Sequence, residues 1–219
     1  MAETNPQSAQ SPAAQTVAAL VARARKAQAA IANYSQTQLD ELVTAAGWAI
    51  MEPSRNRTLA EIAVRDTGLG SVADKINKNH RKTLGLMRDL QGAKSTGVLN
   101  EIPELGLTEI ARPVGVVAAV VPSTNPGATP ANNIINALKC GNAVILSPSP
   151  KGYSTSAQLI EYIYAEFDRI GAPKDLVLTL PHPVTKELSQ QLMKQCDLVV
   201  ITGSQANVRA GYSSGTPAL

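Results

Sequence analysis

The spacing of apolar residues predicts that the first ninety residues are helical. Apolar positions recur every three or four residues there, which is the spacing of one face of an α-helix. The residues that carry the pattern in the first two predicted helices are Val17, Leu20, Val21, Ala24, Ala27 and Ile31, followed by Leu39, Leu42, Val43, Ala46 and Ile50. A third helix is predicted to begin with Ser54 as its cap and to end at Gly68, and a fourth runs from Val72 to Leu90.

The pattern changes after a loop at residues 91–97. Residues 98–113 predict a hairpin with its turn near Glu104, Leu105 and Gly106. The following strands are predicted at 114–121, 143–146, 176–180 and 198–202, and the helices at 130–139, 155–169, 185–194 and from about 205. This alternation predicts an α/β fold: a Rossmann-like parallel sheet with helices on both faces, preceded by an amino-terminal helical segment and a hairpin.

Polar loops follow two of the predicted strands. The valine-rich run from Val114 to Val121 is typical of a strand buried on both faces, and it ends abruptly at P-S-T-N-P-G. Ligands of open parallel sheets bind at the carboxyl ends of the strands. A second loop, T-G-S at 202–204, opens a helix whose exposed N–H groups can bind a pyrophosphate. The sequence lacks G-x-G-x-x-G, the usual dinucleotide-binding motif.

Composition narrows the class of protein. The 219 residues carry a net charge of +3 without a basic cluster and contain only 3% aromatic residues, which argues against nucleic-acid binding. No apolar run reaches the roughly 18 residues needed to span a membrane, and the polar start lacks a signal peptide. The two cysteines show neither disulfide nor zinc-site spacing, so no metal is expected and a reducing, cytoplasmic location is predicted. Residues 1–13 are predicted to be a disordered tail.

Several spaced motifs together resemble one family. The loop P-S-T-N-P (122–126) is accompanied by A-V-R-D-T-G-L-G-S-V-A-D-K-I-N-K-N-H (63–80), I-L-S-P-S-P-K-G (145–152), G-A-P-K-D-L (171–176) and the segment 200–219. Their order resembles the CoA-acylating branch of the aldehyde dehydrogenase superfamily, including its acetaldehyde and sulfoacetaldehyde dehydrogenases. The resemblance implies that residues 14–219 form the NAD(P)-binding domain, with a helical segment (14–97) and the hairpin (98–113), and that the catalytic domain is absent.

The resemblance also implies a reaction and site residues. Such enzymes convert a small aldehyde to an acyl-CoA through a thiohemiacetal, hydride transfer to NAD(P) and thioester exchange with coenzyme A. Asn125 would donate a hydrogen bond to the oxyanion, although an asparagine beside a proline can also simply shape a turn. The cofactor would be held by three groups of residues: Pro122, Ser123 and Thr124 at the nicotinamide end; Ser147, Pro148, Ser149 and Lys151 at the adenosine ribose; and Thr202, Gly203 and Ser204 at the pyrophosphate.

The choice between NAD and NADP stays open. Many family members carry a lysine at the position of Ser147 and a glutamate near Pro150, and both are missing here. Ser149 and Lys151 could attract a 2′-phosphate, yet related acylating enzymes with similar S-P-x-P turns use NAD. The aldehyde also stays open between acetaldehyde and a small anionic aldehyde such as sulfoacetaldehyde.

The remaining reactive residues are interpreted as structural. Cys140 and Cys196 are predicted to be packing residues, and the resemblance places the nucleophilic cysteine in a later domain, so this chain alone is expected to be inactive. His80 and His182 are interpreted as surface residues, and Asp66, Asp74 and Lys75 as solvated helix charges. The full-length protein is expected to be a homo-oligomer, a dimer or tetramer. The alternative function is a non-catalytic nucleotide-binding or interaction module, either a natural truncation or a fragment.

Overall fold

The computed structural model describes residues 11–219, and its first part consists of four helices. They are α1 (Pro12–Ala30), α2 (Gln36–Met51), α3 (Pro53–Thr67) and α4 (Val72–Leu90). These are the four helices that the apolar spacing predicted. Helix α1 begins inside the stretch predicted to be a tail, with Ser11 as its N-cap. The rest of that predicted tail, residues 1–10, lies outside the described residues.

The capping residue of α3 differs from the prediction. The carboxylate of Glu52, not the hydroxyl of Ser54, caps the helix by accepting hydrogen bonds from the N–H groups of Ser54 (3.2 Å) and Arg55 (2.8 Å). A carboxylate binds two free N–H groups at once and also interacts favourably with the positive end of the helix dipole. At the other end the prediction was correct, because Gly68 has the left-handed backbone (φ 67°) that terminates the helix.

The second part of the chain forms a four-stranded parallel sheet. Its strands are β3 (Val116–Val121), β4 (Ala143–Pro148), β5 (Val177–Thr179) and β6 (Leu198–Ile201), in the order β5-β4-β3-β6. The helices that alternate with them are α5 (Ala128–Lys139), α6 (Tyr153–Ile170), α7 (Lys186–Gln195) and α8 (Gln205–Tyr212), with short 3₁₀ turns at Pro150–Gly152 and Lys174–Leu176. The predicted α/β architecture is therefore confirmed. One pairing was not predicted: Ala218 lies parallel to β6 beside Val199.

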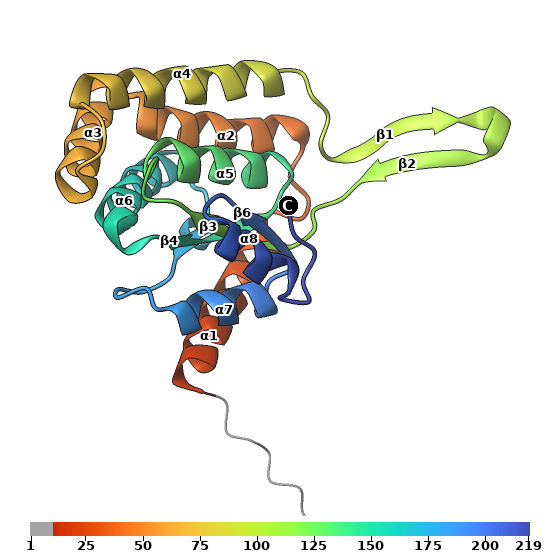
Figure 1. Cartoon of the computed structure of the whole chain (residues 1–219). Helices are drawn as coiled ribbons and strands as arrows, with labels where there is room; N and C mark the ends of the chain where they lie inside the picture. Colours follow the sequence, from red (N-terminus) through yellow and green to blue (C-terminus); the bar gives the residue numbers. More distant parts are fainter. Residues whose placement is uncertain (1–10) are drawn as a thin grey trace, which may run out of the picture.

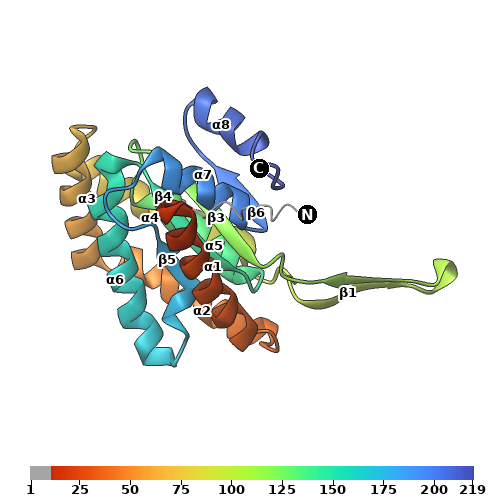
Figure 2. The same cartoon turned by 90° about the horizontal axis from the view of Figure 1, so that it is seen from below.

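Helices cover both faces of this sheet (Figures 1 and 2). Helices α5 and α6 lie on one face, with α2, α3 and α4 forming an outer layer over them, and α1 and α7 lie on the other face. Because both faces are covered, the strands are mostly apolar, and Val116, Ala118 and Ala119 have no exposed surface. Within the described residues, no helix combines the length and the hydropathy required to cross a bilayer.

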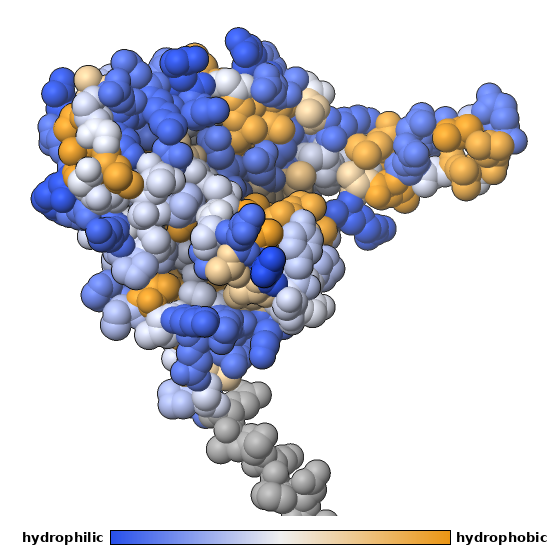
Figure 3. Space-filling view, viewed as in Figure 1, coloured by the Kyte–Doolittle hydropathy of each residue, from blue (hydrophilic) through white to orange (hydrophobic). Residues whose placement is uncertain are grey.

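A two-stranded hairpin projects from this body (Figure 1). It consists of β1 (Gly97–Ile102), a 3₁₀ turn at Pro103–Leu105 and β2 (Leu107–Ala111), as predicted. Its surface is partly apolar (Figure 3): Val98 pairs across the strands with Ile110, and both are exposed. Leu105 at the tip is 67% exposed.

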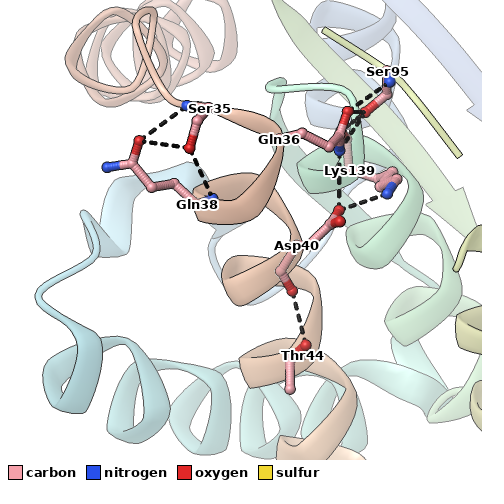
Figure 4. A network of polar contacts seen from close by, with 7 residues as sticks. All are labelled: Ser35, Gln36, Gln38, Asp40, Thr44, Ser95 and Lys139. Carbon is pink, nitrogen blue, oxygen red and sulfur yellow. Dashed lines mark hydrogen bonds and ion pairs between the residues drawn. The ribbon is translucent and has the colours of Figure 1, made fainter. Parts of the chain in front are cut away.

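A polar network fixes the base of the hairpin to the helices (Figure 4). The N–H of Ser95 donates to the side-chain oxygen of Gln36 at 2.8 Å, and the Ser95 hydroxyl donates to the carbonyl of Lys139. The buried ammonium group of Lys139 forms an ion pair of 2.5 Å with Asp40 on α2. These contacts join α2, α5 and the segment that leads into β1, so the hairpin leaves the body from a fixed point.

Candidate cofactor site

A cavity of about 980 Å³ opens at the carboxyl ends of β3, β4 and β6. The loops after these three strands contribute most of the predicted cofactor residues to its lining. The predicted residues that line it are Pro122, Ser123, Thr124, Ser147, Pro148, Ser149, Thr202, Gly203 and Ser204. Two predicted site residues do not line it, namely Asn125 and Lys151.

The register of the strands aligns the carboxyl ends of β3, β4 and β6, from which these loops start. Val120 of β3 pairs with Ser147 of β4 on one side and with Ile201 of β6 on the other. The three strands therefore end side by side, and the polar residues that follow them lie around one opening. The Ser147 hydroxyl is hydrogen-bonded to that of Ser189 on α7, at 2.9 Å between the oxygens. Ser147 thus joins the floor of the cavity to the helix beside it.

Helices α7 and α8 supply lining residues that the sequence analysis missed. Among them, Lys186 and Arg209 are cations that form no ion pair within residues 11–219. Among the described residues, those that line the cavity include no carboxylate. Lys186 is the first residue of α7, and Arg209 lies in the second turn of α8. Each helix follows a strand of the sheet, so the position of these cations near the carboxyl end of a strand could have identified them from the sequence. A cavity with two unpaired cations and no carboxylate favours a negatively charged ligand.

Two further features of the lining fit the phosphates and hydroxyls of a dinucleotide. Ser204 is the N-cap of α8, and its hydroxyl accepts a hydrogen bond from the N–H of Asn207 at 3.4 Å. Because Ser204 also lines the cavity, the amino-terminal end of that helix faces it. Phosphate groups bind well at such helix starts. The Ser149 hydroxyl is buried and has no hydrogen-bond partner among the described residues. It is therefore a buried polar group that a ligand could satisfy.

Buried side chains of α4 and α6 bind the backbone of the loop that contains Asn125. The ammonium group of Lys75 on α4 donates to the carbonyl of Thr124 at 2.7 Å, and the hydroxyl of Ser156 on α6 donates to the carbonyl of Pro126 at 3.3 Å. The prediction that Lys75 is a solvated charge was wrong, because α4 turns it toward the loop and leaves it 7% exposed. Burial, and secondarily the charge of Lys78, lower the pKa of Lys75.

The two cysteines lie away from the cavity. Cys196 is buried before β6, and burial, aided by the charge of Asp197, raises the pKa of its thiol to about 12. Cys140 ends α5 at the opposite edge of the sheet from the cavity. Cys140 is exposed as a residue, but partial burial of its sulfur raises the pKa of this thiol as well. A thiol with a raised pKa holds little of the nucleophilic thiolate at neutral pH.

Comparison with known proteins agrees with this geometry. The sequence profile described as the Aldehyde dehydrogenase family matches residues 3–216. The chain belongs to the aldehyde dehydrogenase family. One curated member, an acylating sulfoacetaldehyde dehydrogenase from Cupriavidus necator, is 65% identical over 206 residues. That alignment covers 94% of this chain and 42% of the relative, so this aldehyde dehydrogenase chain spans less than half the length of the protein that it matches.

Solved structures of acylating enzymes share the fold. An acetylating aldehyde dehydrogenase from Geobacillus thermoglucosidasius superimposes with a TM-score of 0.88 at 33% identity, over 94% of this chain and 45% of that one. A propionaldehyde dehydrogenase from Rhodopseudomonas palustris with bound CoA and an engineered glycolyl-CoA reductase with bound NADP⁺ each give 0.80 at 27% identity. Each of these two alignments covers 93% of this chain and 46% of the other. The resemblance that the sequence motifs indicated is confirmed.

Proposed function

We propose that this chain is the cofactor-binding part of a CoA-acylating aldehyde dehydrogenase, which converts an aldehyde, NAD(P) and coenzyme A to an acyl-CoA. The observation that carries the proposal is the cavity at the carboxyl ends of β3, β4 and β6. Within residues 11–219 its lining holds the unpaired cations Lys186 and Arg209 and no carboxylate. When bound there, NAD(P) supplies the hydride acceptor of the reaction. The nucleophilic cysteine is proposed to lie outside these 219 residues.

Different residues around the cavity are proposed to bind different parts of the cofactor. We assign the nicotinamide end to Pro122, Ser123 and Thr124, and the pyrophosphate to Thr202, Gly203 and Ser204 at the start of α8. The adenosine ribose is assigned to Ser147, Pro148 and Ser149. Lys151 is exposed and lies just past this turn, outside the lining. No described residue of the lining carries a negative charge that would repel a 2′-phosphate, so both NAD and NADP are compatible with the proposed site.

Asn125 is proposed to stabilise the oxyanion that forms when the thiolate attacks the aldehyde. A neutral amide N–H held in place stabilises negative charge without acting as a competing base. Within the described residues the Oδ1 atom of Asn125 is buried and accepts no hydrogen bond. The loop backbone, whose neighbouring carbonyls are held by Lys75 and Ser156, therefore sets the position of this side chain.

The test of this function is Asn125→Ala in the full-length protein. An oxyanion donor acts chiefly on the transition state, so kcat should fall by about 100- to 1,000-fold while the cofactor Kd changes little. Asn125→Asp should lower kcat further, because it adds a negative charge beside a developing one. Asn100→Ala, the same change on the exposed hairpin, is the matched control. Equal losses of rate and of cofactor affinity would mean that Asn125 only shapes the loop.

Substrate, assembly and location are also proposals. The 65% identical relative acts on sulfoacetaldehyde according to its name, which favours a small anionic aldehyde over acetaldehyde. The exposed apolar pair Val98 and Ile110 supports a role of the hairpin in a homodimer or homotetramer. Two free cysteines fit a reducing compartment, and we propose a cytoplasmic location.

A further inference from the structure

The loop from Thr124 to Gly127 is anchored on both sides of Asn125 by side chains from other elements. Lys75 binds the carbonyl before Asn125, and Ser156 binds the carbonyl after it. Gly127 packs against the Asn79 amide, whose oxygen lies 3.2 Å from where a Cβ would stand. The peptide units that flank Asn125 therefore have little freedom to rotate.

Helix α4 presents a buried polar stripe to this loop. Lys75, Asn79 and Thr83 are spaced four residues apart, and all three are buried although the opposite face of α4 is strongly charged. The Asn79 amide nitrogen donates to the Asn56 side chain at 2.9 Å, and the Asn56 amide donates to the Ile76 carbonyl at 3.0 Å. These bonds fix the position of α4 against α3 and thereby the point from which Lys75 reaches the loop.

Lys75 stands out within this stripe because it is a buried cation without an acidic partner. Among residues 11–219 it forms no ion pair, and the one hydrogen bond of its ammonium group is to the Thr124 carbonyl. Burying an ammonium group is unfavourable unless it is paired. An apolar residue could fill this space without the cost of burying a charge. The hydrogen bond of the amino group to Thr124 therefore indicates that Lys75 acts on the loop.

We propose that Lys75 is a positioning residue that fixes the Thr124 carbonyl and thereby holds the Asn125 amide in the orientation needed for catalysis. The inference rests on the proposed function of Asn125. Its geometric part, control of the loop by Lys75, is independent of that function. The two parts can therefore be tested separately.

The geometric part is tested by amide hydrogen exchange on the 219-residue chain. The N–H of Thr129 donates to the Asn125 carbonyl, so its exchange rate reports opening of the loop. Lys75→Met removes a charged donor, and loop opening should increase about 10- to 100-fold. Lys78→Met makes the same change one turn along α4 on an exposed side chain and should leave the rate unchanged. Lys75→Arg, which keeps a charged donor, should restore most of the protection.

Ser156→Ala provides a second variant in case Lys75→Met does not fold. It removes only the hydroxyl that binds the Pro126 carbonyl and should increase exchange at Thr129 by a smaller factor. Amides of β3 serve as the reference for global opening. If neither anchor variant raises exchange at Thr129 above that reference, the loop is held by other contacts and the inference is overturned.

The functional part is tested by a double-mutant cycle in the full-length protein. Lys75→Met alone should lower kcat about 10- to 100-fold with little change in the cofactor Kd, because small misplacement of a catalytic group is costly. If Lys75 acts through Asn125, the same substitution should have little effect in the Asn125→Ala background. Additive losses would overturn the positioning role. If Asn125→Ala alone leaves kcat unchanged, the proposed function is wrong. The control of the loop by Lys75 is still decided separately, by the hydrogen-exchange rates.

Discussion

Asp197 is expected to be one of the most sensitive positions for the stability of this chain. It lies directly before β6, where its carboxylate accepts two hydrogen bonds from Arg25 of α1, at 2.9 and 2.8 Å. The same carboxylate accepts the backbone N–H of Val116, the first residue of β3, at 2.8 Å. One side chain thus joins α1 to the starts of the two neighbouring strands. Asp197→Ala removes all three hydrogen bonds.

The structure allows the size of this loss to be estimated. Val116 is fully buried, so its N–H would lose its acceptor away from water, at a cost of about 1–3 kcal/mol. The Arg25 side chain is 49% exposed, so its pair with Asp197 adds no more than about 1 kcal/mol. The expected decrease in the free energy of unfolding is therefore about 1–4 kcal/mol. Asp197→Asn keeps an acceptor for Val116 and should have a smaller effect.

The chain contains a matched control for this comparison. Arg23, two residues before Arg25 on α1, forms a similar pair with Asp175, at 2.6 and 3.1 Å. Both of these side chains are more exposed (54% and 37%), and within the described part of the chain no backbone N–H donates to Asp175. Asp175→Ala should therefore cost about 0–1 kcal/mol. The difference between the two variants isolates the contribution of the buried Val116 N–H.

The contribution of Asp197 should depend on pH in a defined direction. Burial alone would raise the pKa of this carboxyl, but hydrogen bonds from Arg25 and Val116 outweigh burial and lower it. A carboxyl whose folded-state pKa is lowered stabilises the fold fully above its unfolded pKa of about 3.9. That contribution is lost as the pH falls through the lower, folded-state value. The penalty of Asp197→Ala should thus be constant from pH 7 to pH 5 and shrink below about pH 4.

Urea unfolding at pH 7, 5 and 3.5, followed by circular dichroism, measures these differences as shifts in the midpoint at constant slope. A penalty for Asp197→Ala no larger than that for Asp175→Ala would show that the Val116 N–H finds another acceptor. A penalty that grows on acidification would contradict the direction assigned to the pKa shift.

Three further predictions concern the proposed function. Ser204→Glu should weaken NAD(P) binding at least about tenfold by placing a negative charge where the pyrophosphate is proposed to bind, whereas Ser71→Glu at the start of α4 should not; calorimetry measures both affinities. Ile110→Glu should shift the full-length protein to smaller species in light scattering, and Thr108→Glu on the same strand should shift it less. The 219-residue chain should show no CoA-dependent reduction of NAD(P); turnover that disappears in Cys140→Ala would refute the structural interpretation of that cysteine.

Much of the fold could be predicted because its signals are local. The apolar spacing of α1 to α4 and the buried valine-rich run of β3 depend only on which residues face a core, and both were correct. The cap of α3 was assigned to Ser54 instead of Glu52 because two good capping residues lie two positions apart. Pairing of Ala218 with β6 could not be predicted, because a single bridge after the turn S-S-G-T-P has no periodicity.

The site was predicted only in part, because the sequence does not show in which direction the side chains on the helices point. The order of strands and loops sufficed to place Ser149 and Ser204 at one cavity. It did not show that Lys186 would reach the same cavity, since that depends on the packing of α7 against the sheet. The burial of Lys75 depends on how α4 crosses the loop before α5. In a sequence, a lysine between aspartate and isoleucine on a charged helix resembles any solvated charge.

The two ends of β3 are held by different groups, and this explains why their substitution should have different consequences. At its start, Asp197 accepts the Val116 N–H and Asn142 accepts the Gly115 N–H at 3.0 Å, far from the cavity. At its end, Lys75 holds the loop that carries the catalytic candidate. The strand between them is six residues long and almost wholly buried, so the two sets of contacts lie at opposite ends of one packed element. Loss of the first set should therefore lower stability, whereas loss of the second should lower the precision with which Asn125 is presented to the reacting oxygen.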